Sequence, residues 1–122
     1  MNKAAKQEEF IRCIIEGDHE NIIALCEDED INLGYANNWA IQEATERGYD
    51  NIVSLLLKYK TVNPAARDNH CIRKSINNYN DNITKILLQD KRVDPSAEEN
   101  WAIWLAYDQN KFDIVQLIWK DE

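Results

Sequence analysis

The four-residue string Asn-Trp-Ala-Ile occurs at 38–41 and again at 100–103, 62 residues later in a chain of 122. Half of that spacing is 31 residues, and at the midpoint, 69–72, the sequence reads Asn-His-Cys-Ile, which keeps the Asn and the Ile. The segments 38–68 and 69–99 share eleven identical residues in register without a gap. A fixed period of this length indicates a repeat architecture, in which each repeat is a small unit that stacks on its neighbours.

We expect a single domain, 1–122, built from four repeats at about 8–37, 38–68, 69–99 and 100–122. The first repeat is the most divergent. It aligns with the second at an offset of 30, which matches Ile11 to Ile41 and Ile22 to Ile52. At this offset its loop is one residue shorter than the loop of the second repeat. The first repeat is also more polar, as a terminal repeat requires.

Each repeat carries two short helical patterns. In the second repeat, apolar residues lie three apart over about 40–47, and at i, i+3 and i+4 over about 51–59. Neither helix can bury its apolar side alone, so the repeats must stack and the fold must be all-α. The residues expected to be buried between repeats are Ile52, Leu55, Leu56, Ile83, Ile86, Leu87, Ile114, Leu117 and Ile118.

Helix ends are marked by residues that suit a turn. Gly48 predicts a left-handed stop after the first helix, and Tyr79 and Asn110 take its place in the later repeats. Asp50 and its counterpart 31 residues later stand where the N-cap of the second helix is expected. Pro64 and its counterpart then prevent further helix and favour an extended loop.

Composition restricts the classes of function. The formal net charge of −8 opposes binding to nucleic acid, which needs basic side chains to neutralise phosphates. No apolar run is long enough to span a membrane, and the N-terminus lacks a secretory signal. The three cysteines are odd in number and widely spaced, which is typical of reduced thiols. We therefore expect a cytoplasmic protein that binds neither membrane nor, directly, nucleic acid.

These residues resemble the ankyrin-repeat family over roughly 8–122. The stretch "WAIQEATERGY" at 39–49 matches the family's first helix, and "IVSLLL" at 52–57 is close to the family's Ile-Val-x-Leu-Leu-Leu second helix. The repeat is two residues shorter than usual and lacks the Thr-Pro-Leu-His box, a variety similar to ankyrin arrays of giant DNA viruses and amoebae. The resemblance implies an ankyrin-like solenoid of four helix–turn–helix repeats, with short extended loops in place of full β-hairpin fingers.

The resemblance also implies a function: non-catalytic recognition of a partner protein through the concave face made by first helices and loops. Carried over by position, the partner-binding residues are Asn37, Trp39, Glu46 and Arg47 in the second repeat, Arg67, Asp68, His70, Asn77 and Asn78 in the third, and Glu98, Glu99, Trp101, Asp108 and Gln109 in the fourth. The chain is expected to be a monomer in isolation. The alternative is a small acidic inhibitor, possibly viral, that occupies a basic nucleic-acid-binding surface of a host or rival protein.

The sequence contains no pattern typical of a catalytic or metal-binding site. The two histidines and three cysteines have no zinc-finger spacing, and Cys26 and Cys71 fall at apolar positions where they should be buried and inert. The acidic run 27–30 lacks the alternating ligands and glycine of a calcium loop. We expect no enzymatic activity, no metal and no cofactor.

The tryptophans allow two interpretations. Trp39, His70 and Trp101 recur at 31-residue spacing, and their role is either structural or partner-binding, since tryptophan is common among binding hot spots. Trp104, at the position of the family's box histidine, is interpreted as a core residue.

Overall fold

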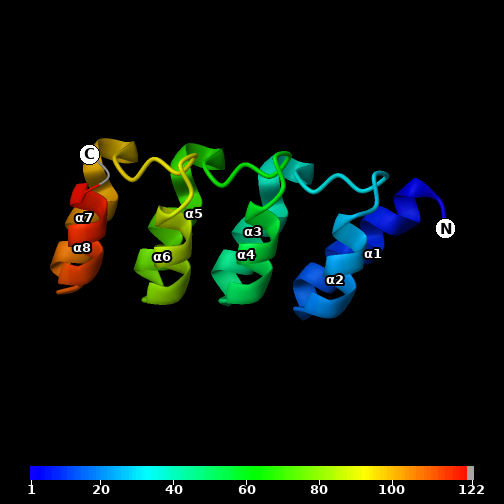
Figure 1. Ribbon diagram of the computed structural model, residues 1–122, viewed down its shortest axis with the longest axis horizontal. Helices are drawn as coiled ribbons and strands as arrows, with labels where there is room; N and C mark the ends of the chain where they lie inside the picture. The colour runs from blue at the N-terminus through cyan, green and yellow to red at the C-terminus, as the bar shows by residue number, and fades with distance from the viewer. Residues whose placement is uncertain (121–122) are drawn as a thin grey trace. The chain divides into compact units, whose positions relative to one another are not determined.

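The computed structural model describes residues 1–120, which form eight α-helices and no β-strand (Figure 1). The prediction of an all-α fold is confirmed, and the loops contain turns where a longer repeat would carry a hairpin. The helices are α1 (Lys3–Glu16), α2 (His19–Cys26), α3 (Tyr35–Arg47), α4 (Asp50–Leu57), α5 (Ala66–Asn77), α6 (Asp81–Leu88), α7 (Ala97–Asp108) and α8 (Phe112–Lys120).

The chain divides into two compact units, Met1–Asn63 and Pro64–Glu122, each containing two helix pairs. In the first unit α1 pairs with α2 and α3 with α4, while α1 packs on α3 and α2 on α4. The second unit repeats this arrangement, with α5 on α7 and α6 on α8. A first helix therefore packs on the next first helix of its unit, and a second helix on the next second helix.

Three of the first helices begin with a left-handed turn. In α3 the residues Ala36, Asn37 and Asn38 have φ of 55°, 56° and 65°, and the right-handed helix starts only after them. The segments 67–69 of α5 and 98–100 of α7 have the same conformation. Figure 1 shows each turn as a short coil bent away from the rest of its helix. Consecutive left-handed residues are unfavourable for L-amino acids, by about 1–2 kcal/mol each.

The third residue of each left-handed turn is the asparagine that marks the sequence period. Asn38 Oδ1 accepts a hydrogen bond from the backbone N–H of Asn63 at 2.7 Å, and Asn69 Oδ1 accepts one from Asp94 N–H, also at 2.7 Å. Asparagine tolerates positive φ better than most residues. The asparagine therefore recurs because its backbone must be left-handed and its side chain holds the following loop.

The predicted stops of the first helices are confirmed. Gly48 ends α3 with φ 77°, and the positive φ recurs at Tyr79 and Asn110, both at 59°. Gly17 ends α1 in the same way, with φ 71°.

The predicted N-caps of the second helices are wrong by one residue. Asp50 and Asp81 are the first helical residues of α4 and α6, where their carboxylates lie in the favourable first turn. The N-cap of α6 is Asn80, whose Oδ1 accepts a hydrogen bond from Ile83 N–H at 3.1 Å. The side chain of Asp18 caps α2 in the same manner.

The alignment of the first repeat at an offset of 30 is also wrong. Gly17 and Gly48 hold the same left-handed position 31 residues apart. Gln7 exchanges hydrogen bonds with the backbone of Asn32, as Asn38 bonds Asn63, again 31 residues apart. The period is therefore uniform, and the expected shortening of the first loop does not occur.

The predicted core is largely confirmed. Seven of the nine residues named above are buried, while Ile86 is half-buried and Leu117 is exposed. Leu117 is exposed because α8 turns this side chain toward a hollow described below. One buried pair is polar: Thr84 Oγ1 donates to Ser75 Oγ at 2.8 Å, which satisfies both hydroxyls inside the second unit.

Candidate functional site

The left-handed turns present charged and polar side chains at the surface. In the second unit, the first two residues of each turn are Arg67 and Asp68 in α5 and Glu98 and Glu99 in α7, all exposed. In the first unit Asn37 occupies the equivalent exposed position in α3. Five of the predicted site residues therefore lie on these turns. We call the turns 36–38, 67–69 and 98–100 the turn tips.

Side chains from the following helical turn fix the backbone of two turn tips. Gln42 Nε2 donates to the carbonyl oxygen of Asn37 at 2.7 Å. Arg73 occupies the same repeat position and donates through Nη2 to the carbonyl oxygen of Arg67 at 3.3 Å. With the asparagine bonds to the loops, these contacts hold an otherwise unfavourable backbone in one conformation.

The tryptophan ladder is partly embedded in the protein. Trp39 and His70 are half-buried, and Trp101 keeps 37% of its surface exposed. The guanidinium carbon of Arg73 lies 5.8 Å from the ring centroid of Trp101, which is a cation–π contact between α5 and α7. Trp101 therefore has a structural contact on one side and an open surface on the other.

The remaining predicted site residues lie at the opposite ends of the first helices. Glu46 and Arg47 are exposed at the end of α3, Asn77 and Asn78 at the end of α5, and Asp108 at the end of α7. About eight helical residues, or about 12 Å, separate each of these positions from the turn tip of its own helix. The structure thus places the predicted residues of each first helix at its two ends, not in one cluster. In the second unit, where α5 packs on α7, we call these residues the strip.

Gln109 is the least accessible of these residues. It is half-buried, and its side-chain Oε1 is buried without a hydrogen-bond partner among the described residues.

The interpretation of Trp104 as a core residue is wrong. Its side chain is 64% exposed, and Trp119 and Tyr107 are also exposed, at 66% and 57%. With Asn100, Ile103 and Val115 they line a hollow of about 310 Å³ on α7 and α8. We call this surface the aromatic face. Sequence reasoning missed it, although the replacement of Gln42 and Arg73 by a tryptophan at position 104 was a signal that this repeat differs.

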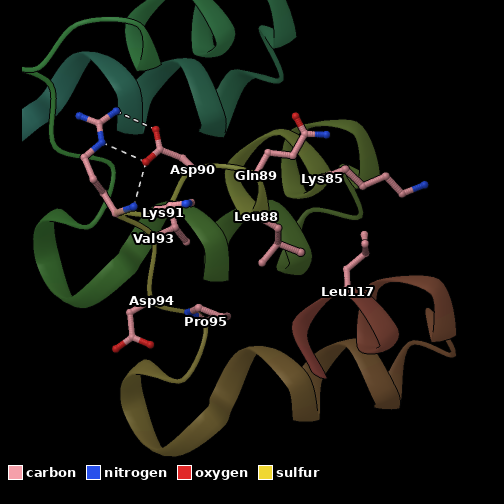
Figure 2. A pocket seen from close by; sticks show the side chains of 10 residues that line it. Lys85, Leu88, Gln89, Asp90, Lys91, Val93, Asp94, Pro95 and Leu117 are labelled. Atoms are coloured by element: carbon pink, nitrogen blue, oxygen red, sulfur yellow. Dashed lines mark hydrogen bonds and ion pairs between the residues drawn. The ribbon is translucent and has the colours of Figure 1, made fainter. Parts of the chain in front are cut away.

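A larger hollow, of about 940 Å³, lies in the second unit beside the loop after α6 (Figure 2). Leu88 of α6 and Leu117 of α8 contribute apolar surface to it, and Asp90 to Pro95 form its edge. Its arginine is already engaged, because Arg92 Nη2 lies 2.7 Å from Asp90 Oδ2. That contact holds the pKa of the Asp90 carboxyl below its usual value.

The three thiols are buried, as predicted for Cys26 and Cys71. Burial raises the pKa of Cys26 to about 11, with a smaller contribution from the neighbouring Glu27 carboxylate. Burial also raises the pKa of Cys13. Because the thiolate is the reactive form, these two side chains are poor nucleophiles at neutral pH. No group of three or more His, Cys, Asp or Glu side chains within residues 1–120 is placed to hold a metal ion.

Comparisons with protein-family models, with curated proteins and with solved structures each gave no match. None of the helices in the described part of the chain has the length and apolar character needed to cross a bilayer. The turn tips, the first-helix ends and Trp101 offer carboxylates, amides, two guanidinium groups and an indole ring. These groups suit recognition of a protein surface through hydrogen bonds and one aromatic contact.

Proposed function

We propose that the chain is a non-catalytic protein-recognition module that binds its partner through the turn tips and the exposed sides of the first helices. The four helix pairs are taken to form an ankyrin-like solenoid, in keeping with the resemblance of 39–49 and 52–57 to that family. The observation that carries the proposal is the left-handed conformation of 36–38, 67–69 and 98–100. Strained backbone of this kind is concentrated at functional sites, where surrounding structure sustains it.

The contacts around the turn tips support a rigid binding surface. A partner that meets Arg67 meets a residue whose carbonyl oxygen already accepts a hydrogen bond from Arg73, in a turn whose Asn69 holds the following loop. Ordering a loop on binding costs affinity, so a surface that is ordered beforehand binds more tightly for the same contacts. Trp101, half-exposed beside these residues, provides the aromatic anchor.

The second candidate function, an acidic inhibitor of a nucleic-acid-binding protein, is favoured by one observation. Glu98 and Glu99 are adjacent, exposed and held on the same turn tip, in a chain of net charge −8. Such a surface attracts basic partners and accelerates association at low salt. The two candidates use the same strip and differ in which of its residues provide the affinity.

The experiment that tests the binding surface is site-specific photo-crosslinking in an extract of the source cell or its host. A crosslinking amino acid at Asn77 or Asp108 lies on the strip, while one at Lys91 or Gln116 is also exposed and lies off it. We expect one protein to be captured from the strip positions and not from the other two. Capture of the same proteins from all four positions, or of none from the strip, would contradict the proposal.

Binding to the captured protein then separates the two candidates. If Trp101 is the anchor, Trp101→Ala weakens binding by about 2 kcal/mol or more, and salt has little effect. If charge dominates, affinity falls steeply with salt, and replacing Glu98 and Glu99 by glutamine slows association more than Trp101→Ala does. Each variant requires a circular dichroism spectrum first, since Trp101 also contacts Arg73.

A further inference from the structure

The aromatic face on α7 and α8 corresponds, repeat for repeat, to a surface that is covered elsewhere in the same unit. The counterparts of Ile103, Tyr107, Val115 and Trp119 are 31 residues earlier, at Ile72, Ile76, Thr84 and Leu88, and all four are buried. They belong to α5 and α6, on which α7 and α8 pack. In the last repeat the same positions carry Tyr107 and Trp119, which are exposed. The aromatic face therefore continues the surface by which one helix pair receives the next.

The size of the aromatic face suits a weak but specific contact. Aromatic side chains contribute about 150–250 Å² each, so the exposed fractions of Trp104, Tyr107 and Trp119 amount to about 400 Å². If two such faces met, about 800 Å² would be buried from these side chains alone. Ile103 and Val115, both half-buried in the same hollow, add to that area. The total approaches the lower limit of specific protein–protein interfaces, near about 1,200 Å².

Charge does not oppose an identical face as the partner. The net charge of −8 makes two copies of the chain repel one another in general. The hollow is an exception, because its lining among the described residues consists of Asn100 and apolar or aromatic side chains, without a charged group. Two aromatic faces can therefore meet without placing like charges at the centre of the interface.

The first helix pair does not offer a matching surface for head-to-tail association. Ala102 and Ile114 are buried in the last repeat, whereas their counterparts in α1 and α2 are Glu9 and Asn21. Arg12 is paired with Glu9 and lies 2.5 Å from Glu16 on the exposed side of α1. Ile15 and Ile23 are also exposed on this pair, but the positions equivalent to the buried Ala102 and Ile114 are polar. The first pair is therefore a poorer partner for the aromatic face than a second aromatic face is.

We propose that a second copy of the chain docks on the aromatic face of α7 and α8, which gives a two-fold symmetric dimer through Trp104, Tyr107 and Trp119. The sequence led us to expect a monomer, and this surface is the reason to revise that expectation. Because each copy contributes the same patch, the assembly closes at two subunits. Of the turn-tip residues, the lining of the hollow includes Asn100 but not Glu98 or Glu99. The dimer rests on the aromatic side chains, so it does not depend on the proposed function.

Sedimentation velocity of the 122-residue chain, from about 10 μM to about 1 mM, tests the proposal. We expect a dimer whose fraction rises with concentration and no larger species. Trp104→Glu and Trp119→Glu each introduce a charge into the centre and should raise the dissociation constant by about tenfold or more. Tyr35→Glu is the matched control, since it adds the same charge at an exposed aromatic residue of the first unit.

Several outcomes would overturn the proposal. A monomer at every concentration would leave the face to a different protein, and a series of species beyond the dimer would indicate head-to-tail contacts. Equal dissociation by Tyr35→Glu would mean that net charge, not the aromatic face, controls association. Both tryptophans are exposed, so both variants should fold, and circular dichroism verifies this. If one variant does not fold, the dissociation constant of the other still tests the proposal.

Discussion

The helix pairs α1–α2 and α7–α8 are built from the same 31-residue repeat but differ in what they expose. The first pair turns a buried Phe10, Cys13 and Ile14 toward the protein and leaves an ion-paired Arg12 at its surface. The last pair buries Ile114 and Ile118 but leaves Trp104 and Trp119 exposed. The same repeat can thus present an ion-paired surface or an aromatic surface that is able to receive another chain.

The two pairs also differ in how they are joined to their neighbours. Tyr49 donates its hydroxyl to the carbonyl of Ile15 at 3.1 Å, and Tyr59 donates to the carboxylate of Glu27 at 2.6 Å, which joins α1–α2 to the rest of its unit. In the second unit, Lys111 lies 2.9 Å from Asp81 and Lys85 lies 3.1 Å from Asp113. Tyrosine hydroxyls join the helix pairs in the first unit, and ion pairs join them in the second.

The largest effect should come from the core of the first pair. Phe10→Ala removes a fully buried ring and should lower the free energy of unfolding by about 3–5 kcal/mol. Trp119→Ala removes a larger side chain from the last pair. It should lower the free energy of unfolding by only about 0.5 kcal/mol, because Trp119 is mostly exposed. Urea unfolding at low protein concentration, where no dimer forms, measures both. A large loss for Trp119→Ala would show that the aromatic face is packed within the chain.

The next effect concerns the left-handed stops of α1 and α7. Gly17→Ala places a side chain at φ 71°, with its Cβ 2.9 Å from the ring of Tyr49, and should cost about 1–3 kcal/mol. Asn110→Gly makes the opposite change at φ 59° and should stabilise the last pair by up to about 1 kcal/mol. Thermal unfolding shows whether Gly17→Ala lowers the stability and Asn110→Gly raises it. If Gly17→Ala is neutral, the helix end of α1 is not held as the structure has it.

A smaller difference is expected for the side chains that hold the loops. Gln7 exchanges two hydrogen bonds with Asn32, so Gln7→Ala should cost about 1 kcal/mol. Asn100 lies at the equivalent position of the last repeat but is exposed, and Asn100→Ala should cost less, about 0.5 kcal/mol. The two variants are compared by their denaturant midpoints, provided that the dependence of the unfolding free energy on denaturant concentration is the same in both. The reverse order would show that the last pair depends on its asparagine more than the first pair depends on its glutamine.

The smallest effects should appear in the dependence of stability on pH. The hydrogen bond to Glu27 raises the pKa of Tyr59 from 10.0 to about 12. The protonated hydroxyl therefore stabilises the fold fully below pH 10, and this contribution is lost as the pH rises toward 12. The difference in stability between the wild type and Tyr59→Phe should shrink over that range. A constant difference would mean that the tyrosine contributes by packing alone.

The ion pair of the last helix pair has the opposite dependence. Its hydrogen bond with Lys85 lowers the pKa of Asp113 below 3.8. The stabilisation is present above pH 3.8 and is lost as the pH falls through the lowered pKa. Both side chains are well exposed, so the effect is small and screened by salt. Comparison of the wild type with Asp113→Asn at low and moderate salt measures it, and an acid loss that survives in Asp113→Asn would have another source.

Much of the fold could be predicted because it depends on periodicity. The 31-residue spacing, the apolar positions of the second helices and Gly48 are all legible in the sequence, and the structure has them where they were expected. The first repeat was misaligned by one residue because apolar matches outweighed the pairing of Gly17 with Gly48. A helix-terminating glycine fixes a register more firmly than a run of isoleucines, since only one backbone position requires it.

The turn tips and the aromatic face could not be predicted in the same way. Propensities describe left-handed residues singly, so three in succession have no sequence signature beyond the recurring asparagine. Trp104 was assigned to the core because it stands at the position of the family's box histidine, yet its exposure depends on whether anything covers α7 and α8. The repeat predicts which positions of each first helix carry the candidate binding residues. Only the structure shows that these residues lie at opposite ends of the helix.

Within each turn tip the third residue is constant and the first two vary, which has a consequence for how such proteins diversify. The third residue is asparagine every time, while the two before it are Ala-Asn, Arg-Asp and Glu-Glu in successive repeats. The asparagine carries the conformational requirement, so the first two positions can change from neutral to mixed to doubly acidic within one chain. Variation is thereby confined to sites that the scaffold tolerates. A gene that duplicates this repeat acquires new surface chemistry by point mutation without having to invent a new fold.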